Sequence, residues 1–236
     1  MREYQSISSL QKFAECPRCY WLNYVAGLRE ESSPAQVLGS EVHEAIKNYH
    51  LGKESKVSEE AGNLYRLYTE NVAQGIVDTP EREFIVPFEN IATGERLPLP
   101  FKGIFDGLST KTGWIHEHKT SSSYWSLDDV ATNLQATGYA YAYFMLFGKL
   151  PEGIRFNILK KNKVTCKYQS LETYRTYEDL VYFFNWAKRI FAEIEVSDFN
   201  PKQNRFGSHH HLCPYARKDL NEGSNISTEG NKELQE

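Results

Sequence analysis

The stretch FKGIFDGLSTKTGWIHEHKT, residues 101–120, contains two apolar segments on either side of a polar turn with a glycine. Both segments are short and contain aromatic and β-branched residues, and turn residues separate them, which predicts two antiparallel strands joined as a hairpin. Side chains alternate between the two faces of a strand. Glu117 and Lys119 are therefore expected on one face of the second strand, and His116 and His118 on the other.

Asp106, in the first of these strands, is the other acidic residue of the hairpin. If the two strands align their faces, Asp106, Glu117 and Lys119 converge. Two neighbouring carboxylates repel each other unless a cation lies between them, and hard oxygen ligands suit Mg²⁺ or Mn²⁺. A lysine beside such a cation can orient an attacking water or stabilise charge on a phosphate. The group predicts metal-dependent hydrolysis of a phosphodiester, with an ordinary exposed Glu–Lys pair as the alternative.

Helical segments on either side of the hairpin supply further candidates. LGSEVHEAI offers His43 as another metal ligand, and Gly39, one turn earlier, permits close approach of another segment. QATGY places Gln135 and Tyr139 four residues apart, on one face of the helix that follows the hairpin. Both side chains can bind phosphate or orient water.

Apolar periodicity and turn residues divide the chain into helices and short strands. Ser126 and Asp129 have the spacing of a capping box, and Gly148 follows the last apolar residue of the same helix. The expected helices are 10–25, with a local adjustment near CPRC, 35–50, 57–75, 126–148 and 176–196, and the expected strands are 82–88, 99–108, 113–120, 153–161 and 163–171. The order predicts an α/β (α+β) protein with a central mixed sheet of about five strands flanked by helices.

The chain of 236 residues is long enough for one sizeable core. We expect one domain, followed by an acidic and disordered tail. No apolar run reaches the roughly 20 residues that cross a bilayer, and the start has no apolar signal segment, so we expect a cytoplasmic (intracellular) protein with no membrane partner. The expected divisions are a helical part, 1–76, a catalytic core, 77–196, an irregular segment, 197–218, and the tail, 219–236.

Charge is distributed unevenly along the chain. The net charge is −4, and the tail from Asp219 carries five acidic residues and one basic residue, which accounts for all of it. The remainder is neutral and can still carry a basic groove, with KKNK (160–163) as one candidate, although such runs are commonly solvated surface. Tyr124 and Trp125, after the hairpin, are candidates for stacking on unpaired bases or for the core.

The succession SISSLQKFAECPRCYWLNYVAGL, LGSEVHEAI, KGIFDGL, IHEHKT and QATGYAYAY, within residues 6–218, resembles the RecB-like exonuclease branch of the PD-(D/E)xK nuclease superfamily. The resemblance implies a restriction-endonuclease-like core and a DNA nuclease, most often an exonuclease acting on free ends in recombination, repair, CRISPR adaptation or phage DNA processing. It implies that His43, Asp106 and Glu117 bind divalent ions, that Lys119 assists the water, and that Gln135 and Tyr139 support the site.

Four cysteines raise the question of a second metal site. Several members of the branch hold a [4Fe–4S] cluster with one Cys near the amino end and three near the carboxyl end. Cys16 and Cys213 match two of these positions, whereas His210 and Asp219 occupy the other two. Cys16, Cys19, His210 and Cys213 can alternatively form a structural zinc or iron–sulfur site, or the cysteines are small core residues. Cys166 is expected to be structural.

Two other functions remain open from the sequence. The first is a DNA-binding or partner-dependent subunit that keeps the fold but contributes little catalysis. The second is a zinc-dependent hydrolase built on His116 and His118, with His43 or His50 as a third ligand. The intact Asp106, Glu117 and Lys119 count against the first. Against the second, no further Asp or His stands at a spacing that connects to this pair, which favours core or surface histidines.

Overall fold

The computed structural model describes residues 2–28, 32–161, 166–200, 203–204 and 207–208. The chain forms two compact units. One contains Glu3–Ile7 and Ser32–Arg189 and holds the main sheet, and the other contains Met1–Arg2, Ser8–Glu31 and Ile190–Glu236. The expected site residues from His43 to Tyr139 all belong to the first of these, which we call the sheet unit.

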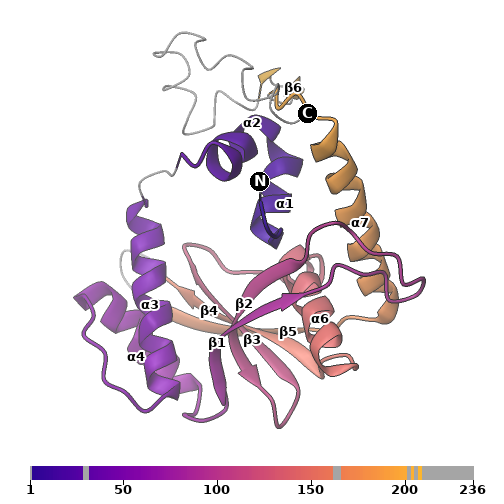
Figure 1. Ribbon diagram of the computed structural model, residues 1–236. Coiled ribbons are helices and arrows are strands. Elements are labelled where there is room, and N and C mark those ends of the chain that lie inside the picture. The colour runs from indigo at the N-terminus through magenta and orange to yellow at the C-terminus, as the bar shows by residue number, and fades with distance from the viewer. Residues whose placement is uncertain (1, 29–31, 162–165, 201–202, 205–206, 209–236) are drawn as a thin grey trace. The chain divides into compact units, whose positions relative to one another are not determined.

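The sheet unit is built on a five-stranded sheet with the order β1-β2-β3-β4-β5 (Figure 1). Antiparallel pairing joins every neighbouring pair except β3 and β4, which are parallel. The sheet is therefore mixed, as predicted. Its strands are β1 (Thr79–Val86), β2 (Phe101–Ser109), β3 (Trp114–Ser121), β4 (Gly153–Lys160) and β5 (Lys167–Thr173).

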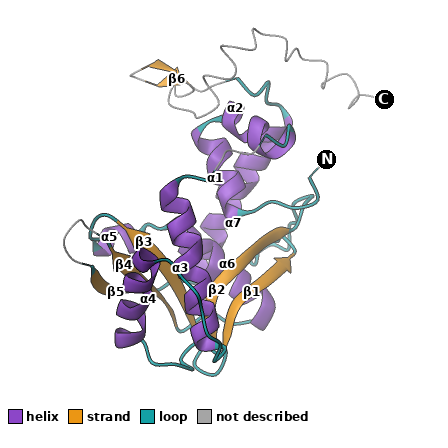
Figure 2. Ribbon diagram, turned by 90° about the vertical axis from the view of Figure 1, so that its left-hand side faces the viewer, coloured by secondary structure: helices purple, strands orange, loops and turns teal. Residues whose placement is uncertain are grey.

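Helices cover both faces of this sheet (Figures 1 and 2). α3 and α4 lie on one face, where their apolar stripes pack with Leu159 of β4. α6 and the first part of α7 lie on the other face, where Tyr141 and Phe183 contact Phe101 of β2. The helices are α3 (Pro34–His50), α4 (Glu59–Asn71), α5 (Leu127–Ala131), α6 (Leu134–Phe147) and α7 (Tyr177–Glu195). We refer to the two sides as the α3 face and the α6 face.

Local sequence signals explain how these helices begin and end. Ser33 caps α3 through a capping box with Gln36, and Pro34 occupies the first turn, where its missing N–H costs nothing. Ser126 and Asp129 form the predicted capping box of α5. Gly148 ends α6 in the left-handed conformation that glycine adopts most easily.

The structure corrects one helix. The sequence predicted a single helix over 126–148, but α5 ends at Ala131 and α6 starts at Leu134. Asn133 adopts an extended conformation between them, and its side chain accepts a hydrogen bond from the Ala136 N–H. An asparagine cap competes with helix continuation because its side chain satisfies a backbone donor at a new helix start.

The other unit begins with helical turns. Cys16 caps α2, where its Sγ accepts a hydrogen bond from Cys19 N at 3.3 Å, and both cysteines are buried with Leu22. His210 and Cys213 lie outside the described residues, so the predicted Cys–His metal set stays a prediction. The elements of this unit are α1 (Ile7–Glu15, whose first residue belongs to the sheet unit), α2 (Pro17–Tyr20), the π-helix η1 (Trp21–Val25), the end of α7, β6 (Gln203–Asn204) and β7 (Gly207–Ser208).

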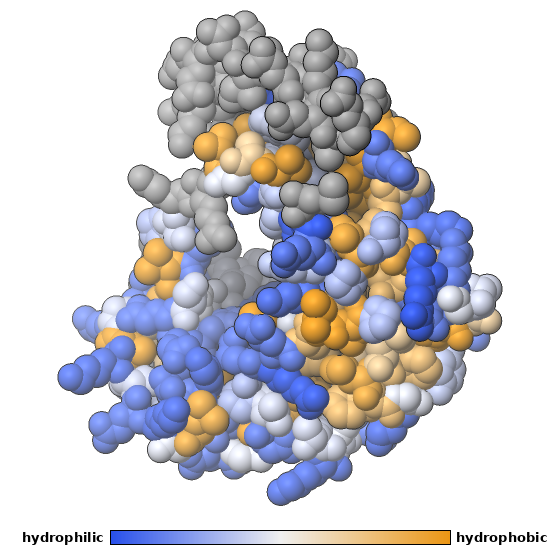
Figure 3. Space-filling model, viewed as in Figure 1, coloured by the Kyte–Doolittle hydropathy of each residue, from blue (hydrophilic) through white to orange (hydrophobic). Residues whose placement is uncertain are grey.

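The surface reflects the way that the helices are packed. Hydrophilic residues dominate the outer sides of α3 and α4 (Figure 3), as expected for helices that bury one stripe and expose the other. None of the helices in the described part of the chain has the length and apolarity to cross a membrane.

Candidate active site

The candidate site lies where β2 and β3 separate. The two strands pair only from Gly107, opposite His116, to Ser109, opposite Trp114. Beyond Gly107 the backbone of β3 has no partner in β2, and the Asp106 carboxylate fills the gap by accepting a hydrogen bond from His118 N at 2.8 Å. The acidic side chain is therefore held at the fork between the two strands.

The regular alternation of β1 and β2 is interrupted at the same level. Gly107 faces the α3 face, so strict alternation would place Phe105 there too. Instead, the Phe105 ring packs against Tyr139 on the α6 face, with ring centroids 5.3 Å apart. The register of β1 and β2 skips Glu81 and Asp106, which lie between the pairs Pro80–Gly107 and Arg82–Phe105. Glu81 has a φ of 50°, in the left-handed region that is uncommon for a residue other than glycine. Glu81 and Asp106 therefore both depart from regular strand pairing at the same level of the sheet.

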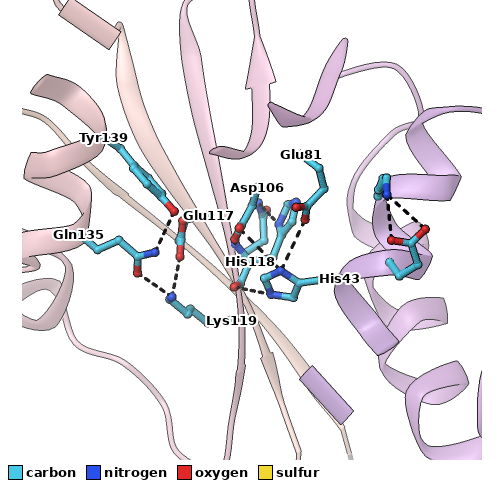
Figure 4. A network of polar contacts seen from close by, with 11 residues as sticks. His43, Glu81, Asp106, Glu117, His118, Lys119, Gln135 and Tyr139 are labelled. Carbon is cyan, nitrogen blue, oxygen red and sulfur yellow. Dashed lines mark hydrogen bonds and ion pairs between the residues drawn. The ribbon is translucent and has the colours of Figure 1, made fainter. Parts of the chain in front are cut away.

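His43 of α3 completes a group of three possible metal ligands (Figure 4). Its Nε2 lies 3.0 Å from the carbonyl oxygen of His118, which only accepts hydrogen bonds, so Nε2 carries the proton. The unprotonated Nδ1 then faces Asp106 Oδ1 at 3.7 Å and Glu81 Oε1 at 4.0 Å. This arrangement, with one ring nitrogen fixed by a carbonyl and the other free to bind, is the usual one for a metal-binding histidine.

Gly39 explains how α3 approaches the sheet at this point. A methyl group added at Gly39 would lie 3.4 Å from Oγ1 of Thr120 in β3. The close approach that the sequence predicted for Gly39 therefore exists, and it brings His43, one turn later, over the fork.

Glu117 and Lys119 lie on the α6 face, as the alternation of β3 predicted. Glu117 Oε1 lies 2.6 Å from Lys119 Nζ, and Glu117 is 1% exposed. Lys119 Nζ also donates to Gln135 Oε1 at 2.8 Å, and Gln135 Nε2 donates to the Tyr139 hydroxyl at 3.0 Å (Figure 4). The two α6 residues thus extend a polar chain that starts at the β3 acid.

Burial governs the protonation of these groups. It raises the pKa of Asp106 from 3.8 to about 7, and it raises the pKa of Glu117 from 4.5 to about 8, with repulsion from Asp106 adding to the second shift. Burial also lowers the pKa of His43, which keeps the imidazole neutral. For Lys119 burial lowers the pKa, but Glu117 and Asp106 more than offset it, so the pKa lies above its ordinary value and the ammonium is retained.

The donor set fits a divalent cation. His43, Glu81 and Asp106 each offer one ligand atom, and these three atoms lie within 4.8 Å of one another. Two ligand atoms on opposite sides of Mg²⁺ are about 4.2 Å apart, so the group is close to the size that coordination requires. Among the described residues, buried Glu117 has Lys119 as the partner of its Oε1, and its Oε2 has no hydrogen-bond partner. Buried carboxylates without enough donors are the groups that a cation satisfies best.

The sequence analysis missed Glu81, although it named the other polar residues gathered at the fork. Glu81 stands in TPEREF together with Glu83, and charged residues near the start of a strand give no signal of a site. The structure groups His43 and Asp106 with Glu81, whereas Glu117 is turned toward Lys119 and lies outside that group of three.

The two histidines of β3 point away from the α6 face. His116 Nε2 lies 3.2 Å from Ser109 Oγ, and His118 Nδ1 lies 3.3 Å from Asn157 Nδ2. The three-residue group around His43 is the one ligand cluster found among the described residues, and it contains neither of them. The geometry therefore gives no support to a zinc site built on His116 and His118.

Metal-free protein is expected to lose stability as the pH rises. Asp106 and Glu117 have raised folded-state pKa values, so their contribution is complete below about pH 4 and is lost as the pH rises through about 7 to 8. Asp106→Asn removes one of these charges. In EDTA, we expect the free energy of unfolding of Asp106→Asn to exceed that of the wild type. This difference should be about 1–3 kcal/mol larger at pH 8 than at pH 5. Urea unfolding at both pH values measures it, and an equal difference at both would contradict the charge assignment.

Glu81→Gln is expected to weaken the binding of Mn²⁺ about 10-fold. It replaces the carboxylate of one of the three possible ligands with a neutral amide, which binds a divalent cation less tightly. Calorimetric titration of the EDTA-stripped protein measures the affinity. Glu83→Gln is the matched control, because Glu83 lies on the same strand but is exposed and paired with Lys102 at 3.6 Å. Equal affinities for both variants would remove Glu81 from the site.

Comparison with known proteins places this geometry in a wider context. The family model described as "PD-(D/E)XK nuclease superfamily" matches residues 4–217. No curated protein matches the chain.

Two solved structures share the fold at low sequence identity. A candidate exonuclease from Eubacterium rectale is 14% identical with a TM-score of 0.62, and the alignment covers 92% of this chain and 88% of that one. The protein SSO0001 is also 14% identical, with a TM-score of 0.51 and coverage of 93% of this chain and 86% of that one. At these identities the likeness concerns the arrangement of helices and strands.

Proposed function

The chain belongs to the PD-(D/E)XK nuclease superfamily, and on that premise we propose that it is a divalent-metal-dependent deoxyribonuclease that digests DNA from free ends. The observation that carries the proposal is the convergence of His43, Glu81 and Asp106 at the fork of β2 and β3, next to the Glu117–Lys119 pair. Membership of a nuclease superfamily indicates phosphodiester hydrolysis, and these side chains are of the types that bind a cation and stabilise charge on a phosphate.

We assign Mg²⁺ or Mn²⁺ to this group because oxygen ligands dominate the set. A bound cation polarises a phosphate oxygen and lowers the pKa of a water molecule. Asp106 would be the central ligand, since its Oδ2 is fixed by His118 N while Oδ1 faces His43. Glu117 lies outside the group of three and pairs with Lys119, and from there it would serve as a further ligand on the α6 face.

Lys119 acts as a cation rather than as a base, because its neighbours hold the ammonium protonated. Glu117 and Gln135 occupy two of its three N–H groups. The third can donate to a phosphate oxygen or hold the attacking water in line. Tyr139 positions Gln135, and through it Lys119.

The preference for free ends is the finer part of the proposal. It is supported by the sequence resemblance to RecB-like exonucleases and by the fold shared with the candidate exonuclease from Eubacterium rectale. Recombination, repair or phage DNA processing are the processes in which such an enzyme would act.

A DNA-binding subunit with little catalysis is the competing function. It does not require the charges of Asp106 and Glu117, whose burial costs stability in the absence of a cation. Their retention at one fork favours the enzyme.

Digestion of end-labelled linear DNA tests the proposal. Single-stranded DNA, blunt duplex and a covalently closed circle are each incubated with Mg²⁺, Mn²⁺ or EDTA, and wild type is compared with Glu117→Gln. We expect metal-dependent loss of the linear substrates by the wild type alone, with the closed circle intact.

The pattern of products separates the alternatives. Cleavage of the closed circle would replace the exonuclease by an endonuclease. DNA binding without cleavage by any metal would establish the binding subunit, and equal cleavage by Glu117→Gln would remove the site from the reaction.

A further inference from the structure

Two further side chains, Tyr124 and Lys160, stand at the carboxyl ends of β3 and β4, beyond Lys119 of the candidate site. The parallel register pairs Lys119 with Ile158 and Ser121 with Lys160. Because side chains alternate, Lys160 lies on the α6 face with Lys119, one step of two residues further along the sheet. That step is about 6.6 Å. The Lys161 N–H donates to Ser121 O at 2.8 Å and fixes the two strand ends together.

Lys160 does not pair with an acidic residue in the described part of the chain. Its Nζ lies 3.8 Å from the centroid of the Tyr124 ring, which is a cation–π contact. Tyr124 is nonetheless 51% exposed, as expected for a ring with one face covered by a lysine and the other open to solvent. An exposed aromatic ring beside a lysine is the combination that binds single-stranded nucleic acids.

The residue after Tyr124 explains why the exposed ring has a fixed position. Trp125 is half-buried, and its ring packs on Phe156 of β4 with centroids 5.5 Å apart. Its backbone N–H donates to Gln169 Oε1 at 3.0 Å, and its carbonyl accepts from Gln169 Nε2 at 2.8 Å. Of the two aromatic residues that the sequence singled out, Trp125 is thus an anchor and Tyr124 is presented to solvent.

The charged residues next to this pair in the sequence form no ion pair with Lys160 among the described residues. Lys161 points to the α3 face, where it pairs with Glu60. Asp129, in the first turn of α5, accepts hydrogen bonds from Ser126 N and Oγ at 2.7 and 2.8 Å, so it serves the capping box. Asp128 is the remaining acid of that turn, and it is exposed.

We propose that Tyr124 and Lys160 form a subsite that stacks an unpaired base and contacts the backbone of the nucleotide one or two steps from the cleaved phosphate. The inference rests on the proposed nuclease function. Lys160 lies about 6.6 Å further along the sheet than Lys119 and one strand, about 4.8 Å, to its side, which favours contact with a neighbouring phosphate over contact with the cleaved one. The face of a base is accessible to Tyr124 only where the base is unstacked. The subsite therefore takes a nucleotide of single-stranded DNA or of a frayed duplex end, and not one within an intact stack.

Binding measurements in EDTA, where cleavage is absent, test the subsite directly. Fluorescence anisotropy compares a labelled single-stranded oligonucleotide with a blunt duplex of the same sequence. Tyr124→Ala is expected to weaken single-strand binding about 10-fold and to leave duplex binding unchanged, and Tyr124→Phe is expected to match the wild type. Tyr182→Ala is the matched control, because Tyr182 is a 65% exposed tyrosine in the middle of α7.

Lys160→Gln tests the phosphate contact separately. It should weaken binding and reduce the slope of log affinity against log salt by about one, as the loss of one phosphate contact does. Equal affinity of Tyr124→Ala and Tyr182→Ala for the single strand would overturn the subsite. So would an equal loss on single strand and duplex.

A cleavage assay with Mn²⁺ separates the two proposals. If the wild type digests single-stranded DNA and Tyr124→Ala does so with an unchanged KM, the nuclease stands and the subsite fails. If the wild type cleaves no DNA but Tyr124→Ala selectively loses single-strand binding, the subsite stands and the nuclease fails.

Discussion

Asp106→Asn is expected to lower kcat/KM for linear DNA at least 1,000-fold while making the metal-free protein more stable. The substitution keeps the size of the side chain and an oxygen that accepts from His118 N. It removes the charge that faces His43 Nδ1 and that is central to the proposed cation site. A loss of metal-dependent charge stabilisation of about 4 kcal/mol corresponds to this factor.

Two readouts make the result specific. Initial rates of digestion with saturating Mn²⁺ give kcat/KM, and thermal unfolding with and without Mn²⁺ reports binding of the cation. We expect the metal-induced rise in Tm to disappear in Asp106→Asn. A variant that is inactive and also less stable than the wild type at pH 8 in EDTA would show that Asp106 has a structural role instead.

Lys119→Met is expected to lower kcat about 100- to 1,000-fold and to leave the metal-induced rise in Tm intact. Methionine retains most of the aliphatic side chain but removes the ammonium that Glu117 and Gln135 hold. Removing one preorganised charge that stabilises a reacting group typically costs this much. Single-turnover digestion measures the rate constant of the chemical step, and steady-state digestion measures kcat.

Gln135→Ala provides the graded comparison for Lys119. It removes one of the two acceptors of the Lys119 ammonium and also the contact with Tyr139. We expect a smaller loss of about 10-fold, because Glu117 still holds the lysine. A loss equal to that of Lys119→Met would mean that Gln135 contacts the substrate itself.

Much of the fold follows from local patterns in the sequence. The helix expected over 35–50 is α3, and the residues that recur at helical spacing along it, Leu38, Val42, Ala45 and Ile46, are all buried. The hairpin of β2 and β3 and the antiparallel pair of β4 and β5 also follow from short-range signals. The break at Asn133 does not, because the apolar pattern continues across it and only the competition between two caps decides the helix boundary.

The candidate site follows from the sequence in part, and the reason lies in its geometry. Strand alternation places Glu117 and Lys119 together, since both belong to one strand. Glu81 enters through a backbone conformation that no side-chain pattern encodes, namely a positive φ inside β1. The separation of β2 from β3, which makes room for Asp106, is likewise a property of the packed sheet and not of either strand alone.

The parallel pairing of β3 with β4 has a consequence for synthesis of the protein. All eight residues of β3 pair with β4, which begins only at Gly153, whereas β2 holds β3 at three positions. A chain that has emerged from the ribosome only as far as Lys119 therefore lacks the strand that fixes Glu117 and Lys119 in place. Long-range pairing forms late because loop closure must precede it. We expect unfinished chains to lack the assembled candidate site, since β3 gains its full pairing only when translation has passed Lys160.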